Sequence, residues 1–137
     1  MSVVLVDSSA WVEFDRATGS AADLTLTRFI IEEEPIAVTE PVIMEVCAGA
    51  RTAARESDLR RLLARFSLLP FDPVPDFNGA VTIHRRCRAA GVTPRGMVDC
   101  MIAAVALRRS AQVLAWDRDF AQLAEVVDLS LHPSSLR

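Results

Sequence analysis

The feature that most constrains the fold of this chain is the alternation of short apolar runs with longer segments that have helical periodicity. Each run is bounded by polar or turn residues, and its continuous apolar character is typical of a strand in a parallel sheet that is covered on both faces. The runs predict strands at Val3–Val6, Ile36–Val38, Gln112–Leu114 and Val126–Leu129, with a weaker candidate at Ser67–Leu69.

Between these runs, apolar residues recur with helical spacing, and capping residues mark several ends. Pro41 suits a first helical turn, whereas Gly49 and Gly91 suit the position just after a helix. The prolines between Pro70 and Pro75 are interpreted as a surface crossover loop. The predicted helices are Ser9–Arg16, Ser20–Glu32, Thr39 or Glu40 to Gly49, Ala53–Phe66, Phe77–Ala90, Met97–Leu107 and Asp117–Glu125.

The length and composition of the chain suit one folded unit. It has 137 residues, of which 51% are hydrophobic, and a chain of this size can bury about two-thirds of the surface that its unfolded form exposes. Strands that alternate with helices indicate an α/β fold with a mostly parallel central sheet of four to five strands, flanked by helices. We therefore expect a single domain over residues 1–137.

The charge of the chain restricts its partners only weakly. The net charge is −3, which argues mildly against a nucleic-acid partner, but the local field matters more than the total charge. All 15 basic residues are Arg; a GC-rich coding sequence explains this better than phosphate recognition does. The arginine-rich helical segments are interpreted as solvated faces, with a phosphate-steering rim as the alternative.

Other features of the sequence exclude several kinds of site. The three cysteines lack metal-ligand spacing and sit among apolar neighbours, so we expect them to be structural. The segment MSVVLVDSS has no basic region like that of a signal peptide, and no stretch approaches the roughly 18 apolar residues of a membrane span. We expect a cytoplasmic protein with no membrane contact.

Two acidic residues stand where predicted strands end. Asp7 follows Val3–Val6, and Asp117 lies just past Gln112–Leu114. The carboxyl ends of parallel strands are where ligands bind in α/β sheets. Each residue alone could equally be the N-cap of the following helix.

Two further acidic residues interrupt apolar helical segments. Asp99 has apolar neighbours in GMVDCMIAAVAL, and Glu45 lies in PVIMEVCAGA, where we expect its neighbours to be buried. A helix N-terminus could explain Asp99, and a nearby Arg partner could explain Glu45. If all four carboxylates converge, their repulsion requires a cation, and carboxylate oxygens are the ligands that Mg²⁺ and Mn²⁺ prefer.

Four segments resemble the motifs of the PIN-domain family, and within it the VapC toxins of toxin–antitoxin pairs. VVLVDSSAWVEF is similar to the first strand with its Asp, and TEPVIMEVCAGA to the helix with its Glu. VDCMIAAVAL and VLAWDRDFAQLA are similar to the third and fourth acidic motifs. Each motif alone is weak, but the four in this order are specific, and the resemblance runs from Val3 to about Leu129. It implies a PIN-like three-layer sandwich.

The resemblance also implies roles for individual residues. The acidic quartet Asp7, Glu45, Asp99 and Asp117 would be catalytic and would bind Mg²⁺, with Mn²⁺ as a substitute. Ser9 and Asp119 would support the quartet, and Ala115 stands where many members of the family have Thr. Arg95, four residues before Asp99, is the best candidate for a substrate or antitoxin contact.

The implied activity is endonucleolytic cleavage of RNA that leaves a 3′-hydroxyl and a 5′-phosphate. The implied partners are a VapB-type antitoxin and a second copy of the chain, for which the apolar faces around Phe29 and Phe66 are candidates. A haloacid-dehalogenase-type phosphatase or a receiver domain would need a Lys, which the chain lacks. The alternative that stays open is a catalytically inactive PIN-like module that binds RNA or protein.

Overall fold

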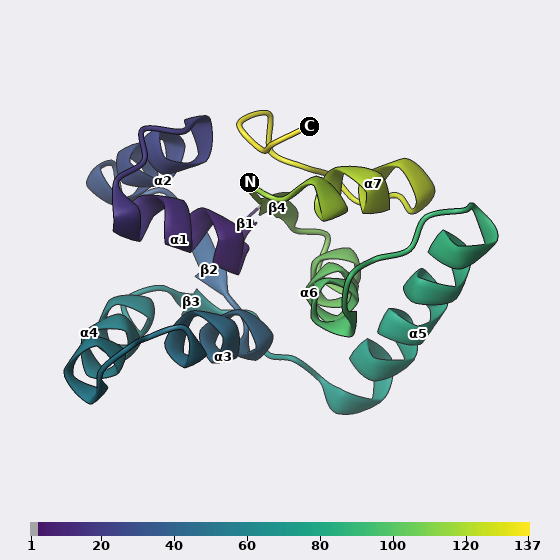
Figure 1. Ribbon diagram of the computed structural model, residues 1–137, viewed down its shortest axis with the longest axis horizontal. Helices are drawn as coiled ribbons and strands as arrows, with labels where there is room; N and C mark the ends of the chain where they lie inside the picture. Colours follow the sequence, from purple (N-terminus) through teal and green to yellow (C-terminus); the bar gives the residue numbers. More distant parts are fainter. Residues whose placement is uncertain (1–2) are drawn as a thin grey trace.

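The computed structural model describes residues 3–137, and within them a parallel sheet is flanked by helices on both faces (Figure 1). The strands are β1 (Val4–Val6), β2 (Ile36–Val38), β3 (Ser67–Leu68) and β4 (Gln112–Leu114). The helices are α1 (Ser8–Arg16), α2 (Ala21–Ile31), α3 (Glu40–Ala48), α4 (Ala53–Leu63), α5 (Pro73–Ala89), α6 (Met97–Arg108) and α7 (Arg118–Val126).

The strand order is β3-β2-β1-β4, and every pair of neighbours is parallel. From β1 the chain moves outward through β2 to β3, and then crosses back to place β4 on the other side of β1. Because parallel crossovers are right-handed, this reversal of direction puts the two sets of connecting helices on opposite faces. In Figure 1, α1 to α4 lie in the left half of the view and α5 to α7 in the right half. The expected three-layer α/β sandwich is confirmed.

The core lies between the sheet and these helices. Leu5, Val6 and Val113 are completely buried in the strands, as the continuous apolar runs predict. Helix α6 carries an unbroken buried series, and its packing against α5 closes the second face. Gly79 of α5 permits this close packing, because a Cβ added there would lie 3.1 Å from the Cβ of Ala104.

The predicted strand at Val126–Leu129 is wrong. Helix α7 continues to Val126, and the following chain is extended but reaches the open edge of β4 only at Ser130–His132. There the N–H of Val113 donates to the carbonyl of Ser130, and His132 N–H donates to Val113. The apolar alternation in this segment reports its burial against the core, whereas hydrogen bonding to the sheet begins later and amounts to a single bridge.

Two other expectations also need correction. The Pro70–Pro75 segment is only in part a loop, because α5 begins at Pro73, where the missing N–H and fixed φ of proline suit a first turn. Phe29 is buried inside the chain, and Phe66 packs on Trp11. Phe29 is therefore not free for a second copy, whereas Phe66 is only half-buried and Ile31 near Phe29 is exposed, so a dimer face around them stays a prediction. Helix α5 also exposes apolar side chains, namely Val74, Phe77 and Val81.

Candidate active site

The predicted acidic residues gather at the carboxyl ends of β1 and β4, the two strands between which the strand order reverses. Asp7 directly follows β1, and its N–H continues the ladder by donating to the carbonyl of Leu114 at 2.9 Å. Asp117 follows β4 by three residues. In open α/β sheets this reversal point leaves a crevice at the strand ends, where ligands bind.

Both strand-end aspartates are also helix N-caps. Asp7 Oδ2 accepts from the N–H of Ser9 at the start of α1, and Asp117 Oδ1 accepts from the N–H of Asp119 at the start of α7. The capping interpretation is therefore correct for both residues. It is compatible with a site, because each cap places one carboxylate at the shared edge of the sheet and fixes its orientation.

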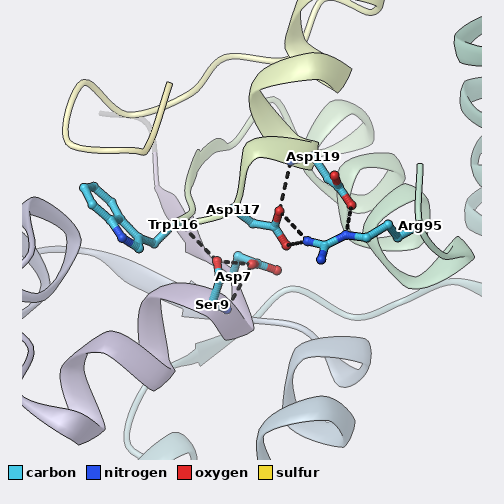
Figure 2. A network of polar contacts seen from close by, with 6 residues as sticks. All are labelled: Asp7, Ser9, Arg95, Trp116, Asp117 and Asp119. Carbon is cyan, nitrogen blue, oxygen red and sulfur yellow. Dashed lines mark hydrogen bonds and ion pairs between the residues drawn. The ribbon is translucent and has the colours of Figure 1, made fainter. Parts of the chain in front are cut away.

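Ser9 joins the first and last acidic segments. Its hydroxyl donates to Asp7 Oδ2 at 2.5 Å and accepts from the N–H of Trp116 at 2.8 Å, as Figure 2 shows. This one side chain holds the end of β1 against the turn that leads from β4 to Asp117.

Among residues 3–137, the second oxygen of the Asp7 carboxylate has no hydrogen-bond partner. Asp7 is only 2% exposed, and its Oδ1 atom is buried without a hydrogen bond. Burial raises the pKa of Asp7 from 3.8 to about 6, although the hydrogen bonds from Ser9 oppose the rise. A buried acceptor without a donor is costly, and a bound cation would remove that cost.

Glu45 reaches the site from α3. Its Oε1 atom accepts from the hydroxyl of Ser8 at 2.6 Å, and no Arg pairs with it among residues 3–137. The premise that its helical neighbours are all buried is wrong, because Met44 is 53% exposed. The contribution of Ser8 is not evident from the sequence; the only available signal is a second hydroxyl residue directly after Asp7, at the first position of α1.

Asp99 lies in the first turn of α6, half-buried beside the other carboxylates. The pKa of Asp99 is raised from 3.8 to about 8. Burial is the main cause, and the nearby charges of Asp7, Asp117 and Glu45 contribute to the rest. No hydrogen bond within residues 3–137 compensates for the rise. Asp99 is therefore the carboxylate that is most difficult to ionise without a cation.

The carboxylates form two triads that share Asp99. One contains Asp7, Glu45 and Asp99, and the other contains Asp99, Asp117 and Asp119; in each, one oxygen per residue lies within 4.8 Å of the others. A cavity of about 330 Å³ opens onto most of these residues. Hard oxygen donors at this spacing fit Mg²⁺ or Mn²⁺, and the unpartnered Oδ1 of Asp7 marks the first triad as the better prepared.

Arg95 also lines this cavity, and Figure 2 shows its guanidinium beside Asp117 and Asp119. Its Nε donates to Asp119 Oδ2 at 2.9 Å, and one terminal nitrogen donates to both oxygens of Asp117 at 3.0 and 3.1 Å. The sequence places Arg95 near the site but does not show this pairing. The structure thus brings together all the predicted site residues, with Ser9 and Arg95 bound to different carboxylates.

A second, larger groove borders the acidic cavity. It has a volume of about 500 Å³ and lies between α1, α3 and α4. Glu45 lines both hollows, so that they adjoin. Arg16 and Arg51 give the groove exposed positive charge, whereas Arg55 is paired with Asp15. The other two arginines of α4, Arg60 and Arg61, form surface pairs with Glu56 and Asp58, which supports a solvated face for them.

Comparisons with known proteins agree with this geometry. The model of the PIN domain family matches residues 4–126. The VapC ribonuclease Mb1587 of Mycobacterium bovis and ribonuclease VapC11 of Mycobacterium tuberculosis are each 41% identical to the chain, over 93% of its length and 96% of theirs. Among solved structures, VapBC2 from Rickettsia felis, bound to a promoter DNA fragment, matches with a TM-score of 0.76 and 14% identity, covering 98% of this chain and 99% of that one.

Proposed function

This chain belongs to the PIN domain family, and on that premise we propose that it is a metal-dependent endoribonuclease, the toxin of a type II toxin–antitoxin module. The observation that carries the proposal is the pair of carboxylate triads around Asp99, one of which includes a buried, unpartnered oxygen of Asp7. Relatives with 41% identity over nearly the whole chain are named ribonucleases, which supports RNA as the substrate.

We assign the metal to the carboxylates as follows. Asp7, Glu45 and Asp99 would hold a divalent cation, Mg²⁺ with Mn²⁺ as its substitute, and Asp117 would bind a second, weaker one, with Asp119 in support. A bound divalent cation supplies an activated water and neutralises the phosphate under attack. Ser9 keeps Asp7 oriented and Ser8 keeps Glu45 oriented, so both carboxylates are in position before RNA arrives.

The chain must attract RNA in spite of its net negative charge. Arg16 and Arg51 line the groove that adjoins the acidic cavity at Glu45, and we propose that they contact phosphates of the bound strand. Arg95 would contact a phosphate nearer the cleaved bond at times when it is not paired with Asp117 and Asp119. Its fork of N–H groups suits that contact.

We further propose that residues 1–137 act as one domain, pair with a VapB-type antitoxin and form homodimers. The matching structure from Rickettsia felis contains both VapB and VapC, which supports the antitoxin. Within residues 3–137 no helix is long and apolar enough to cross a membrane. An RNA substrate and an antitoxin partner would place the protein in the cytoplasm.

The test compares Asp7→Asn with Asp128→Asn, a matched change at an exposed carboxylate that belongs to neither triad. We expect the parent and Asp128→Asn to cleave RNA with Mn²⁺ or Mg²⁺ and to stop in chelator. Asp7→Asn should lose about a hundredfold or more of the rate while its circular dichroism spectrum stays unchanged. Cleavage by Asp7→Asn at the parental rate would refute the site. A parent that binds RNA without cutting it would instead be an inactive binding module.

A further inference from the structure

Arg95 divides the acidic cluster into two halves whose oxygens differ in what they bind. Both oxygens of Asp117 accept from Arg95, and Oδ1 also accepts from the N–H of Asp119. Asp119 Oδ2 accepts from Arg95 Nε. Three of the four oxygens of this pair therefore already have a donor.

Within the part of the chain that the structure describes, the other half of the cluster keeps its acceptors open. Asp7 Oδ1 is buried without a partner, Glu45 uses only Oε1, in its bond from Ser8, and burial and neighbouring charge act on Asp99 without any hydrogen bond. In Figure 2 the guanidinium of Arg95 lies against Asp117 and Asp119, and Asp7 lies apart from it. One triad is therefore ready for a cation, whereas the other is already neutralised in part.

We propose that Arg95 is an internal counter-ion that keeps the Asp99–Asp117–Asp119 triad closed to a second divalent cation, so that Arg95 and this cation exclude each other. The inference rests on the proposed function, because it concerns the same metal site. A guanidinium keeps its charge at any physiological pH. It cannot share the oxygens of Asp117 with a dication, since the two compete for the same lone pairs and repel each other.

The exchange is physically accessible. Arg95 lies on the loop between α5 and α6 and its side chain is 77% exposed. Its partners Asp117 and Asp119 are only 23% and 13% exposed, so this pair is held more strongly than a pair of fully exposed groups. Because the guanidinium itself is exposed, its release would require no rearrangement of the core. The freed donors could then bind a phosphate of RNA, so entry of the second cation would be coupled to substrate contact.

The experiment measures Mn²⁺ binding by isothermal titration calorimetry on metal-stripped full-length protein. Arg95→Ala is compared with the parent and with Arg118→Ala, which removes the same charge from an exposed residue between Asp117 and Asp119 in sequence. We expect the parent to bind one Mn²⁺ tightly and a second weakly. The Kd of the second Mn²⁺ should fall by about tenfold or more in Arg95→Ala and by less than about threefold in Arg118→Ala. Coincident isotherms for the two variants would overturn the inference.

A second pair of variants separates competition from a general change in charge. Asp117→Asn added to Arg95→Ala should abolish the gain, because it removes a ligand of the opened triad. Arg95→Lys keeps the positive charge but lacks the forked N–H groups of the guanidinium. The Kd of its second Mn²⁺ should therefore lie between the values for the parent and for Arg95→Ala. A gain that survives Asp117→Asn would refute the assignment to this triad.

The outcome is distinct from that of the proposed function. Mn²⁺ binding does not require RNA, so the predicted isotherms would support the role of Arg95 even if the parent cleaved no RNA. Conversely, a parent that cleaves RNA, together with an Arg95→Ala isotherm like that of Arg118→Ala, would refute the role of Arg95 alone.

Discussion

Replacing Asp99 with Asn tests whether the carboxylates repel one another in the absence of metal. Asn keeps the size and shape of the side chain but removes its charge. Burial and the neighbouring carboxylates raise the pKa of Asp99 from 3.8 to about 8 in the folded protein. An unfolded chain ionises this group near pH 4. Between about pH 4 and pH 8 the metal-free protein must therefore take up a proton to fold.

The sign and size of the effect follow from this linkage. Since the unfolded state holds fewer protons in that window, the stability of the parent falls as pH rises from about 4 to about 8. Each unit of pKa difference corresponds to ~1.4 kcal/mol, but Asp99 is only half-buried and faces the cavity, so screening reduces the cost to about 2 kcal/mol at neutral pH. The lost interaction with the N-terminus of α6 opposes this by ~0.5 kcal/mol. Asp99→Asn should therefore be more stable by about 1.5 kcal/mol.

Thermal melts in chelator at about pH 4, 6 and 8 measure this difference. We expect the Tm of Asp99→Asn to exceed that of the parent by roughly 5 °C at pH 8, and the two to converge at pH 4. Asp128→Asn, at an exposed position, should follow the parent throughout. In Mn²⁺ the order should reverse, because the parent gains binding energy that the variant lacks. An Asp99→Asn protein that is less stable than the parent at pH 8 in chelator would refute the reasoning.

Two other predictions concern side chains that support the fold and the site. Ser9→Ala removes the link between Asp7 and the N–H of Trp116. Urea melts should show a loss of about 1–2 kcal/mol in the free energy of unfolding, and calorimetry should show roughly tenfold weaker binding of the first Mn²⁺. Ser130→Ala, at an exposed position, should change neither quantity. Asp76 is 1% exposed and accepts two hydrogen bonds from Arg108 at 2.8 Å. Asp76→Ala should cost about 2–4 kcal/mol, and an equal stability of Asp76→Ala and the surface variant Asp58→Ala would contradict a structural role for the pair.

The local sequence pattern is sufficient where the neighbouring residues in the sequence decide whether a residue lies in a strand or a helix. The bounds of β2 and β4 agree with the apolar runs, because a strand buried on both faces must be apolar throughout. The same kind of signal predicts helix α6. Asp7 and Asp99 are unusual in the sequence because Asp7 ends, and Asp99 interrupts, a segment that the core requires to be apolar.

The local sequence pattern is misleading where a segment is buried but its backbone hydrogen bonds are not those that the pattern predicts. Val127 and Leu129 are buried after the end of α7, yet the chain pairs with β4 only farther along, at Leu131. The prolines between Pro70 and Pro75 predict a loop, whereas Pro73 and Pro75 lie in the first turn of α5, which accommodates proline. In both cases the deciding factor is which backbone groups find partners, and those partners lie elsewhere in the chain.

The sequence by itself therefore determined the α/β layering, the positions of the acidic residues and the need for a cation if those residues converge. The tertiary structure alone decided that Asp99 is shared by two triads, that Ser9 links Asp7 to Trp116, and that Arg95 pairs with Asp117 and Asp119. Burial and periodicity are properties of neighbouring residues. The partners of a carboxylate depend on the strand order, which brings the ends of β1 and β4 together across more than a hundred residues.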